Sequence, residues 1–221
     1  MKILALDSSG LVASVALLEN DNLVAEFTVN NKKTHSQTLL PMLDEVVNAA
    51  GIELDAVDAI AIAAGPGSFT GLRIGAATVK GLSLALDKPV VPVPTLEGLA
   101  YNFWGSDRLI CPIMDARRNQ VYTGLYRFDE AGNLVTEMDQ IPMDVNELID
   151  LLLEKDEEVQ FTGDGIQVYG SQILSKMKHA RLAPAHLNKQ KAGSVAYAGA
   201  YRYAHEQYIN CLLYTSPSPR D

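Results

Sequence analysis

Cysteines and long apolar runs are scarce in this 221-residue sequence. Its only cysteines are Cys111 and Cys211, and one pair cannot form a disulfide framework, so we expect a protein of a reducing compartment, the cytoplasm. No run of about 20 apolar residues occurs, which argues against a membrane-spanning helix. The opening residues, MKILALD, hold too short an apolar stretch for a signal peptide, which needs about 7 to 15 such residues.

Basic residues are also in deficit. The chain has 18 Lys and Arg against 27 Asp and Glu, a net charge of −9. This charge repels phosphate backbones and anionic lipid, so we expect no membrane binding and no tight, unaided binding of nucleic acid. The hydrophobic share of 48% is that of a globular protein, and the length allows two lobes of roughly 100 residues each.

Familiar catalytic and metal-binding motifs are missing. No G-x-S-x-G surrounds Ser68, and the glycine-rich stretch lacks the Gly-Lys-Ser/Thr of a P-loop. No two histidines stand four residues apart around a carboxylate, so we expect no metal ligand. With these motifs missing, we also expect no catalytic residue, and we expect the histidines to lie at ordinary surface positions. They are His35, His179, His186 and His205.

The carboxyl end, CLLYTSPSPRD (211–221), differs from the rest of the chain. Its two Ser-Pro pairs argue against a helix or a central strand. A frayed native tail would explain this composition. The peptide also resembles the translation of a sequencing-library adaptor, and we therefore expect a non-native tail and a truncated second lobe.

Two segments about half the chain apart share one pattern. A short apolar strand ends at Asp7, and a polar turn leads into alternating strands up to residue 29. A second apolar strand, from residue 109, ends at Asp115 and is followed by alternation up to residue 128. A duplicated lobe explains the pattern most simply, although hairpins are common enough for a chance match.

Helical and strand signals alternate after each hairpin. The stretch from residue 34 to 51 predicts a helix with an apolar face, a kink at Pro41 and a C-cap at Gly51. Further elements are predicted at 57–64, 71–86, 88–93, 144–155 and 158–163, with a helix after Asp164. This order indicates an α/β fold: a duplicated, actin-like (acetate kinase/Hsp70/actin, ribonuclease H-like) pair of lobes with mixed sheets. We place the lobes at residues 1–103 and 104–210.

The segment AGPGSFTGLRIG (64–75) allows two interpretations. It lies between a predicted strand and a predicted helix, where free backbone N–H groups favour an anion such as phosphate. The spacing departs from G-x-G-x-x-G, because the third glycine comes one residue late. Alternatively, Gly71, Gly75 and Ala76 form a smooth helix face against which another helix packs closely. We favour packing.

A second candidate site is the turn Asp7-Ser8-Ser9-Gly10. In actin-like phosphotransferases such a hairpin wraps the nucleotide phosphates, and the aspartate holds a magnesium-bound water. Asp115 would be its counterpart, and the turn Gly163-Asp164-Gly165 could be a further nucleotide-facing turn. An ATP-dependent phosphotransferase that uses Asp7 and Asp115 is therefore an alternative function.

Several segments together resemble one family. LALDSS, KKTHSQTLLPML, AGPGSFTGLRIG, VPTLEGLA, MDARRNQVY and FTGDG are similar to the TsaB (YeaZ) family, the dimerisation subunit of the bacterial tRNA threonylcarbamoyladenosine system. The resemblance runs from Met1 to about Asn210. Catalytic TsaD relatives carry a metal-binding His-x-Glu-x-His, whereas Thr95 and Leu99 stand at the matching positions here. Leucine cannot ligate a metal.

The resemblance implies a non-catalytic scaffold that binds TsaD as a heterodimer, TsaE in a ternary complex, and a second copy of itself. Contact with tRNA would come only through the complex, no cofactor would be required, and ATP or ADP could lie at the complex interface. Vestigial nucleotide contacts would be Asp7, Ser8, Ser9, Gly163 and Gly165. The implied partner-binding residues, on two helices of the first lobe, are Leu39, Leu43, Val46, Gly71, Arg73, Gly75, Val79 and Leu82.

Overall fold

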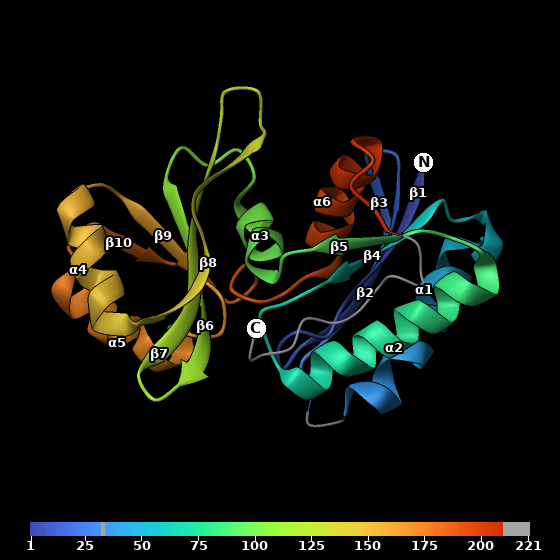
Figure 1. The fold of residues 1–221 in the computed structure, drawn as a ribbon, viewed down its shortest axis with the longest axis horizontal. Helices are drawn as coiled ribbons and strands as arrows, with labels where there is room; N and C mark the ends of the chain where they lie inside the picture. The colour runs from blue at the N-terminus through green and yellow to red at the C-terminus, as the bar shows by residue number, and fades with distance from the viewer. Residues whose placement is uncertain (32–33, 210–221) are drawn as a thin grey trace. The chain divides into compact units, whose positions relative to one another are not determined.

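The computed structural model describes residues 1–31 and 34–209 (Figure 1). The predicted non-native tail at 211–221, with Cys211, lies outside these residues. The chain forms two compact units, one of residues Met1–Gly98 with the segment from Gln190 onward, and one of Leu99–Lys189.

The first unit contains a five-stranded mixed sheet in the order β3-β2-β1-β4-β5. Antiparallel pairs join β1 to β2 and β2 to β3, and parallel pairs join β1 to β4 and β4 to β5. Strands β1 and β4 are almost wholly buried, as the apolar runs predict. The strands are β1 (Lys2–Asp7), β2 (Ala13–Glu19), β3 (Asn22–Val29), β4 (Ala59–Ala63) and β5 (Val90–Val93).

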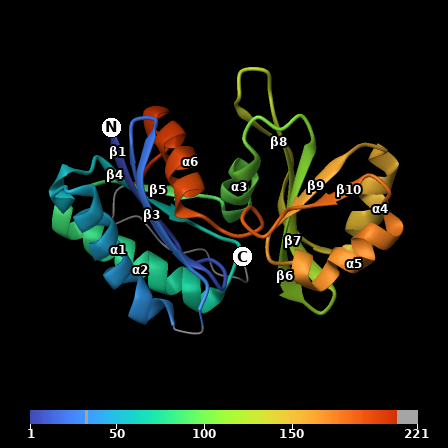
Figure 2. The same cartoon turned by 180° about the vertical axis from the view of Figure 1, so that it is seen from behind.

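Helices cover both faces of this sheet (Figures 1 and 2). Helices α1 (His35–Ala50) and α2 (Phe69–Leu86) lie on one face, and α6 (Ala192–Ala204) lies on the other. Successive strand residues point to opposite faces, so Leu4 belongs to the core beneath α1 and α2 while Ile3 lies near Gly199 of α6. The first unit also contains the short helices η1 (Leu54–Ala56) and, crossing into the second unit, α3 (Thr95–Ala100).

Helix α1 agrees with its sequence prediction. Its buried residues, Leu39, Met42, Leu43 and Val46, recur at the spacing of one helix face. Gly51 caps the helix in the left-handed conformation, with φ of 66° and its N–H bonded to the carbonyl of Asn48. Pro41 lies inside the helix, and the kink there stays a prediction.

The second unit repeats the topology of the first. Its sheet has the order β10-β9-β6-β7-β8, with antiparallel pairs along β6-β7-β8 and parallel pairs along β6-β9-β10. Read in the opposite direction, the order is β8-β7-β6-β9-β10, which corresponds strand by strand to β3-β2-β1-β4-β5 of the first unit. The duplicated α/β fold is therefore confirmed. Its elements are η2 (Tyr101–Phe103), β6 (Leu109–Arg117), β7 (Gln120–Phe128), β8 (Leu134–Asp144), α4 (Val145–Lys155), β9 (Val159–Thr162), α5 (Ile166–Lys176) and β10 (Ala180–Leu182).

The last helix departs from the predicted domain division. The sequence placed residues 104–210 in one lobe, whereas the structure assigns the segment from Gln190 to the first unit and puts the other boundary at Gly98. The reason is the small-residue face of α6, where Ala192, Ala196 and Gly199 let the helix lie directly on β1, β2 and β4. An ion pair of 2.6 Å between Arg202 and Glu97 adds to this attachment.

None of the helices within residues 1–31 and 34–209 has both the length and the apolar character that a membrane span requires.

Two helix glycines give opposite predictions for stability. A Cβ at Gly199 would lie 2.6 Å from the Cβ of Ala61, whereas a Cβ at Gly81 would meet nothing within 4 Å. Gly199→Ala should therefore lower the free energy of unfolding by about 1 to 3 kcal/mol. Gly81→Ala should raise it by up to about 1 kcal/mol, because alanine favours helix. Urea unfolding of both variants checks this, and a stabilised Gly199→Ala would contradict the packing of α6.

Candidate functional site

Two turns meet at one edge of the first sheet. Strands β1 and β4 are parallel neighbours, so the turn after β1 and the glycine-rich loop after β4 leave the sheet side by side. The N–H of Ser68 donates to the carbonyl oxygen of Ser9 at 2.6 Å. Gly67 lies so close that a Cβ there would be 2.2 Å from the same oxygen. The turn after β1 and the glycine-rich loop, which the sequence predicted as two separate candidate sites, therefore form one structural feature.

The start of α2 packs on the turn after β1. Ser68 is the N-cap, and its Oγ accepts from the N–H of Gly71 at 3.3 Å. The Oγ of Ser8 donates to the carbonyl of Gly71 at 2.9 Å. A Cβ at Gly71 would lie 2.1 Å from the carbonyl oxygen of Ser8, and one at Gly75 would lie 2.4 Å from its Oγ. These glycines are required by the chain's own turn, and not by a neighbouring helix as the sequence suggested.

The carboxyl group of Asp7 is enclosed at the centre of this feature. Asp7 is 1% exposed, and its Oδ1 accepts from the N–H of Ser9 at 2.9 Å and from the Oγ of Ser9 at 2.6 Å. Burial raises the pKa of Asp7 from 3.8 to about 6, and the bonds from Ser9 and the nearby His35 oppose the rise. Asp7 thus has the environment of an internal group.

His35 differs from the predicted surface histidine. It is half-buried at the start of α1, and its Nε2 lies 2.8 Å from the carbonyl oxygen of Gly10. Because a carbonyl only accepts, Nε2 carries the proton in this contact. His35 therefore ties α1 to the turn after β1, whereas His179, His186 and His205 are exposed as predicted.

The burial of this turn bears on the nucleotide hypothesis. Asp7, Ser8 and Ser9 are at most 2% exposed, and their side chains bond within the chain. A phosphotransferase would need Asp7 to face a cation-bound water. The geometry lends no support to that role, and vestigial nucleotide contacts at these residues stay a prediction.

The second unit has a corresponding pair of turns with a more open arrangement. A Cβ at Gly163 would lie 2.2 Å from the carbonyl oxygen of Ile113, and one at Gly165 would lie 2.9 Å from it. Asp115 is exposed here, and its N–H donates to Oδ1 of Asp164 at 3.2 Å. Burial, with repulsion from Asp115, raises the pKa of Asp164. The two halves share this architecture but differ in how far each aspartate is covered.

Thr95 and Leu99, where the resemblance implies histidines in catalytic relatives, have structural roles in this chain. The Oγ1 of Thr95 accepts from the N–H of Gly65 at 3.1 Å, and the N–H of Thr95 donates to the carbonyl of Gly65 at 2.8 Å. Thr95 thereby closes the glycine-rich loop, and Leu99 is 1% exposed. Within residues 1–31 and 34–209, no three His, Cys, Asp or Glu side chains gather as metal ligands would.

Most of the implied partner-binding residues are internal, which corrects the sequence-based assignment. The apolar stripe of α1, which the resemblance assigned to a partner, belongs to the core beneath α1 and α2, and Leu82 is half-buried against this core. Arg73 is exposed, with its guanidinium carbon 3.7 Å from the centre of the Phe69 ring. The buried members are Leu39, Leu43, Val46, Gly71, Gly75 and Val79.

A different face of the same helices is exposed, and Arg73 is the only one of its residues that the sequence predicted to bind a partner. Leu84 of α2 is 58% exposed, Leu40 of α1 is 55% exposed, and the small residues Ala77 and Gly81 lie on the exposed side of α2. We call Leu40, Arg73, Ala77, Gly81 and Leu84 the α1/α2 outer face. Its signal in the sequence is the helical spacing of Arg73, Ala77, Gly81 and Leu84, which places them on the side of α2 away from Gly71 and Gly75.

The buried carboxyl group predicts a pH-dependent effect of Asp7→Asn. Since folding raises the pKa of Asp7 from 3.8 to about 6, the folded state keeps a proton that the unfolded chain releases, and the free energy of unfolding falls as the pH rises through this window. Asparagine has no such titration and can still accept from Ser9. Relative to that of the parent, the free energy of unfolding of Asp7→Asn should rise by about 2 kcal/mol between pH 4 and pH 7. Urea unfolding across this range measures it, and a constant difference would contradict the burial.

The close contact at Gly75 predicts a rescue. Gly75→Ala should cost about 1 to 3 kcal/mol, because its Cβ would meet the Oγ of Ser8 at 2.4 Å. Ser8→Ala alone should cost about 1 kcal/mol through the lost bond to Gly71. The double variant should cost less than the two together, since alanine at position 8 removes the obstructing oxygen. Urea unfolding of the four proteins checks this, and additive costs would refute the contact.

Comparison with known proteins agrees with this architecture. The family model described as "TsaD: tRNA N6-adenosine threonylcarbamoyltransferase" matches residues 22–210. The TsaB protein of Bacillus subtilis is 38% identical over 177 residues, covering 78% of this chain and 75% of that protein. The TsaB protein of Escherichia coli is 38% identical over 135 residues, 60% of this chain and 58% of its own length. A tRNA N6-adenosine threonylcarbamoyltransferase of Syntrophobacter fumaroxidans is 36% identical over 127 residues, 56% of this chain but 37% of that enzyme.

Solved structures extend the comparison. A Pseudomonas aeruginosa protein described as similar to the peptidase YeaZ superposes with a TM-score of 0.83 and 27% identity, covering 98% of both chains. The activator of 2-hydroxyisocaproyl-CoA dehydratase from Clostridium difficile superposes with a TM-score of 0.51 at 12% identity, over 94% of this chain and 97% of the other, and shares the fold alone. The chain belongs to the family that the TsaD model describes and, within it, to the TsaB (YeaZ) proteins.

Proposed function

We propose that this chain is a non-catalytic subunit in tRNA threonylcarbamoyladenosine biosynthesis. In this role it binds TsaD as a heterodimer and, with TsaE, supports transfer of a threonylcarbamoyl group to the adenosine 3′ of the tRNA anticodon. The observation that carries the proposal is the exposed α1/α2 outer face on a chain of the TsaB family. The curated relatives are named for this biosynthesis.

A scaffold role is supported by what the chain's own residues do. Thr95 and Leu99, which the resemblance places at the positions of a metal-binding histidine pair, are both held in internal contacts. Asp7, the strongest catalytic candidate, is enclosed by the turn that packs on α2. These residues hold the loop and the helix in place and do not present a reactive group.

The α1/α2 outer face has the composition of a helix-packing surface. Ala77 and Gly81 allow close approach of a partner helix, and a Cβ at Gly81 would meet nothing in this chain, so internal packing does not explain the glycine. Leu84 and Leu40 would each supply roughly 1.5 to 3 kcal/mol when buried, before association costs are deducted. A second copy of the chain could occupy the same face, so homodimer and heterodimer would compete.

The buried glycines act on this surface indirectly. Gly71 and Gly75 set the depth at which α2 lies on the turn after β1, and this depth places Ala77, Gly81 and Leu84 at the surface. Gly75→Glu consequently tests folding and not the partner surface. The partner surface is therefore tested at exposed positions.

The remaining parts of the proposal concern tRNA and nucleotide. With a net charge of −9, contact with tRNA would come through the partners, since phosphates are repelled. The chain would act in the cytoplasm and would require no cofactor of its own. ATP or ADP would bind at the interface of the complex.

The proposal predicts that charge on the α1/α2 outer face disrupts the heterodimer. Leu84→Glu and Arg73→Glu should each weaken binding to TsaD of the same genome at least about tenfold. Leu84→Glu places a carboxylate in an apolar contact, and Arg73→Glu replaces a cation of the contact with a carboxylate. Co-purification and size-exclusion chromatography measure the loss, and threonylcarbamoyladenosine formation by the reconstituted system should fall with it.

The matched control is Leu174→Glu. Leu174 is 51% exposed on α5, the counterpart of α2 in the second unit, so the same change is made on the corresponding helix. This variant should bind TsaD as the parent does. If Leu84→Glu and Arg73→Glu also bind like the parent, the interface assignment fails.

A further inference from the structure

Two exposed side chains at the start of α2 are stacked on each other. Phe69 is the first residue of the helix and is 42% exposed, and Arg73 lies one turn later. The guanidinium carbon of Arg73 is 3.7 Å from the centre of the Phe69 ring. At this distance the cation is attracted by the face of the ring, so the guanidinium rests against the phenyl group and is restricted in its motion.

The stacked guanidinium has no carboxylate partner in the described part of the chain. Four other arginines each pair with a glutamate: Arg108, Arg127, Arg181 and Arg202. Within residues 1–31 and 34–209, Arg73 forms no salt bridge. The first turn of α2 contains no acidic residue either. Arg73 is therefore held in place while its charge stays unpaired.

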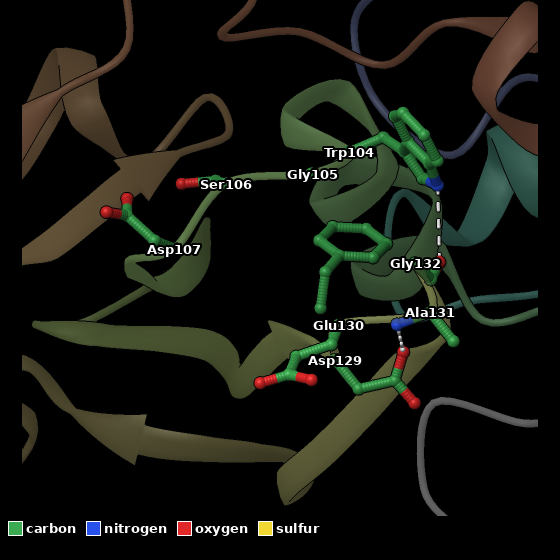
Figure 3. A pocket seen from close by; sticks show the side chains of 9 residues that line it. Trp104, Gly105, Ser106, Asp107, Asp129, Glu130, Ala131 and Gly132 are labelled. Atoms are coloured by element: carbon green, nitrogen blue, oxygen red, sulfur yellow. Dashed lines mark hydrogen bonds between the residues drawn. The ribbon is translucent and has the colours of Figure 1, made fainter.

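The second unit shows the contrasting case, in which an exposed aromatic residue and a nearby arginine have internal partners. Figure 3 shows Trp104 beside Gly132 in a pocket of about 380 Å³. The Nε1 of Trp104 donates to the carbonyl of Gly132 at 3.2 Å, and Arg108 pairs with Glu158 at 2.6 Å. The chain's own acceptors thus satisfy these two side chains, whereas no carboxylate of the described chain pairs with Arg73.

The stacked pair continues the α1/α2 outer face toward the start of α2. Arg73 is part of that face, and Phe69 lies four residues before it, so the two side chains share one side of the helix. A partner helix that packs over Ala77 and Gly81 would reach the pair about one to two turns earlier in α2. The unpaired cation therefore lies where the proposed partner would cover it.

We propose, resting on the proposed function, that Arg73 binds a carboxylate of TsaD when TsaD covers the α1/α2 outer face. A guanidinium offers a carboxylate two parallel N–H groups, and such charge-assisted pairs are stronger than neutral hydrogen bonds. Because Phe69 already restricts the guanidinium, less side-chain entropy is lost on binding. Phe69 is the positioning residue of this contact, and Arg73 is the residue that binds.

The salt dependence of TsaD binding tests the charge. Calorimetric titration with TsaD of the same genome, at about 50 and about 500 mM sodium chloride, gives the two dissociation constants. Arg73→Gln should weaken binding about five- to tenfold at low salt, and its dissociation constant should rise less with salt than that of the parent. Leu84→Ala removes only apolar contact, so it should weaken binding but keep the salt dependence of the parent.

A double-mutant cycle tests the stacking. Phe69→Leu should weaken TsaD binding about two- to fivefold in the parent, because the guanidinium is no longer held in place. In the Arg73→Gln background the same change should have little effect. Arg73→Lys keeps the charge without the planar fork, so its affinity should lie between those of the parent and Arg73→Gln.

The matched control is Arg108→Gln, because Arg108 is exposed and has its own carboxylate partner in Glu158. This variant should bind TsaD as the parent does at both salt concentrations. Urea unfolding of each variant confirms that it is folded.

Several outcomes would overturn the carboxylate contact while leaving the proposed function intact, provided that Leu84→Glu still disrupts the heterodimer. One is an Arg73→Gln variant that binds like the parent or keeps its salt dependence, which would indicate a neutral acceptor. Another is an equal effect of Phe69→Leu in both backgrounds. A third is a loss of self-association by Arg73→Gln with unchanged TsaD binding, which would assign the carboxylate to a second copy of the chain. If Leu84→Glu and Arg73→Glu both bind like the parent, the interface itself fails.

Discussion

Helix α2 approaches the turn after β1 so closely that Gly67, Gly71 and Gly75 have no room for a side chain. Asp7 is buried in the turn at this contact, which uses Ser8 and Ser9 as its polar partners. It also turns one face of α2 inward and leaves the opposite face, rich in small residues, in contact with solvent. A site that could have held phosphate is thus used to fix a helix, and the helix supplies the surface on which the proposed partner role depends.

The two halves show how one topology supports different local chemistry. Both sheets pair their strands in the same order, and in both a glycine of the turn after the fourth strand packs against the first strand or the turn that follows it. In the first half Asp7 is buried, whereas Asp115 in the second half stays exposed beside Asp164. Both aspartates stand near the end of the first strand, but only Asp7 is buried. Because desolvation disfavours the charged carboxylate, the extent of burial decides how each aspartate behaves.

The partner-binding residues show where reasoning from a pattern fails. The family resemblance implied that Leu39, Leu43 and Val46 bind a partner, and their apolar stripe fitted that role, but the first sheet already covers them. An apolar stripe predicts that a face is buried and does not say whether the chain itself or another molecule buries it. Gly71 and Gly75 were correctly identified as sites of close packing, yet the neighbour is the Ser8 turn. The long edge strand β8, which carries several acidic residues and Pro142, was not predicted at all.

By itself the sequence determined the elements that depend on local pattern: the aspartate-ended strands, the amphipathic helix α1 with its Gly51 cap, the order of the duplicated halves, and the need for glycine after β4. Tertiary structure decided which face of α2 points outward, that α6 returns to the first sheet, and that residues 104–107 and 128–132 enclose a pocket. The physical reason is that periodicity and turn chemistry act over a few neighbouring residues. Burial depth, by contrast, depends on segments far apart in the chain that only the completed fold brings together.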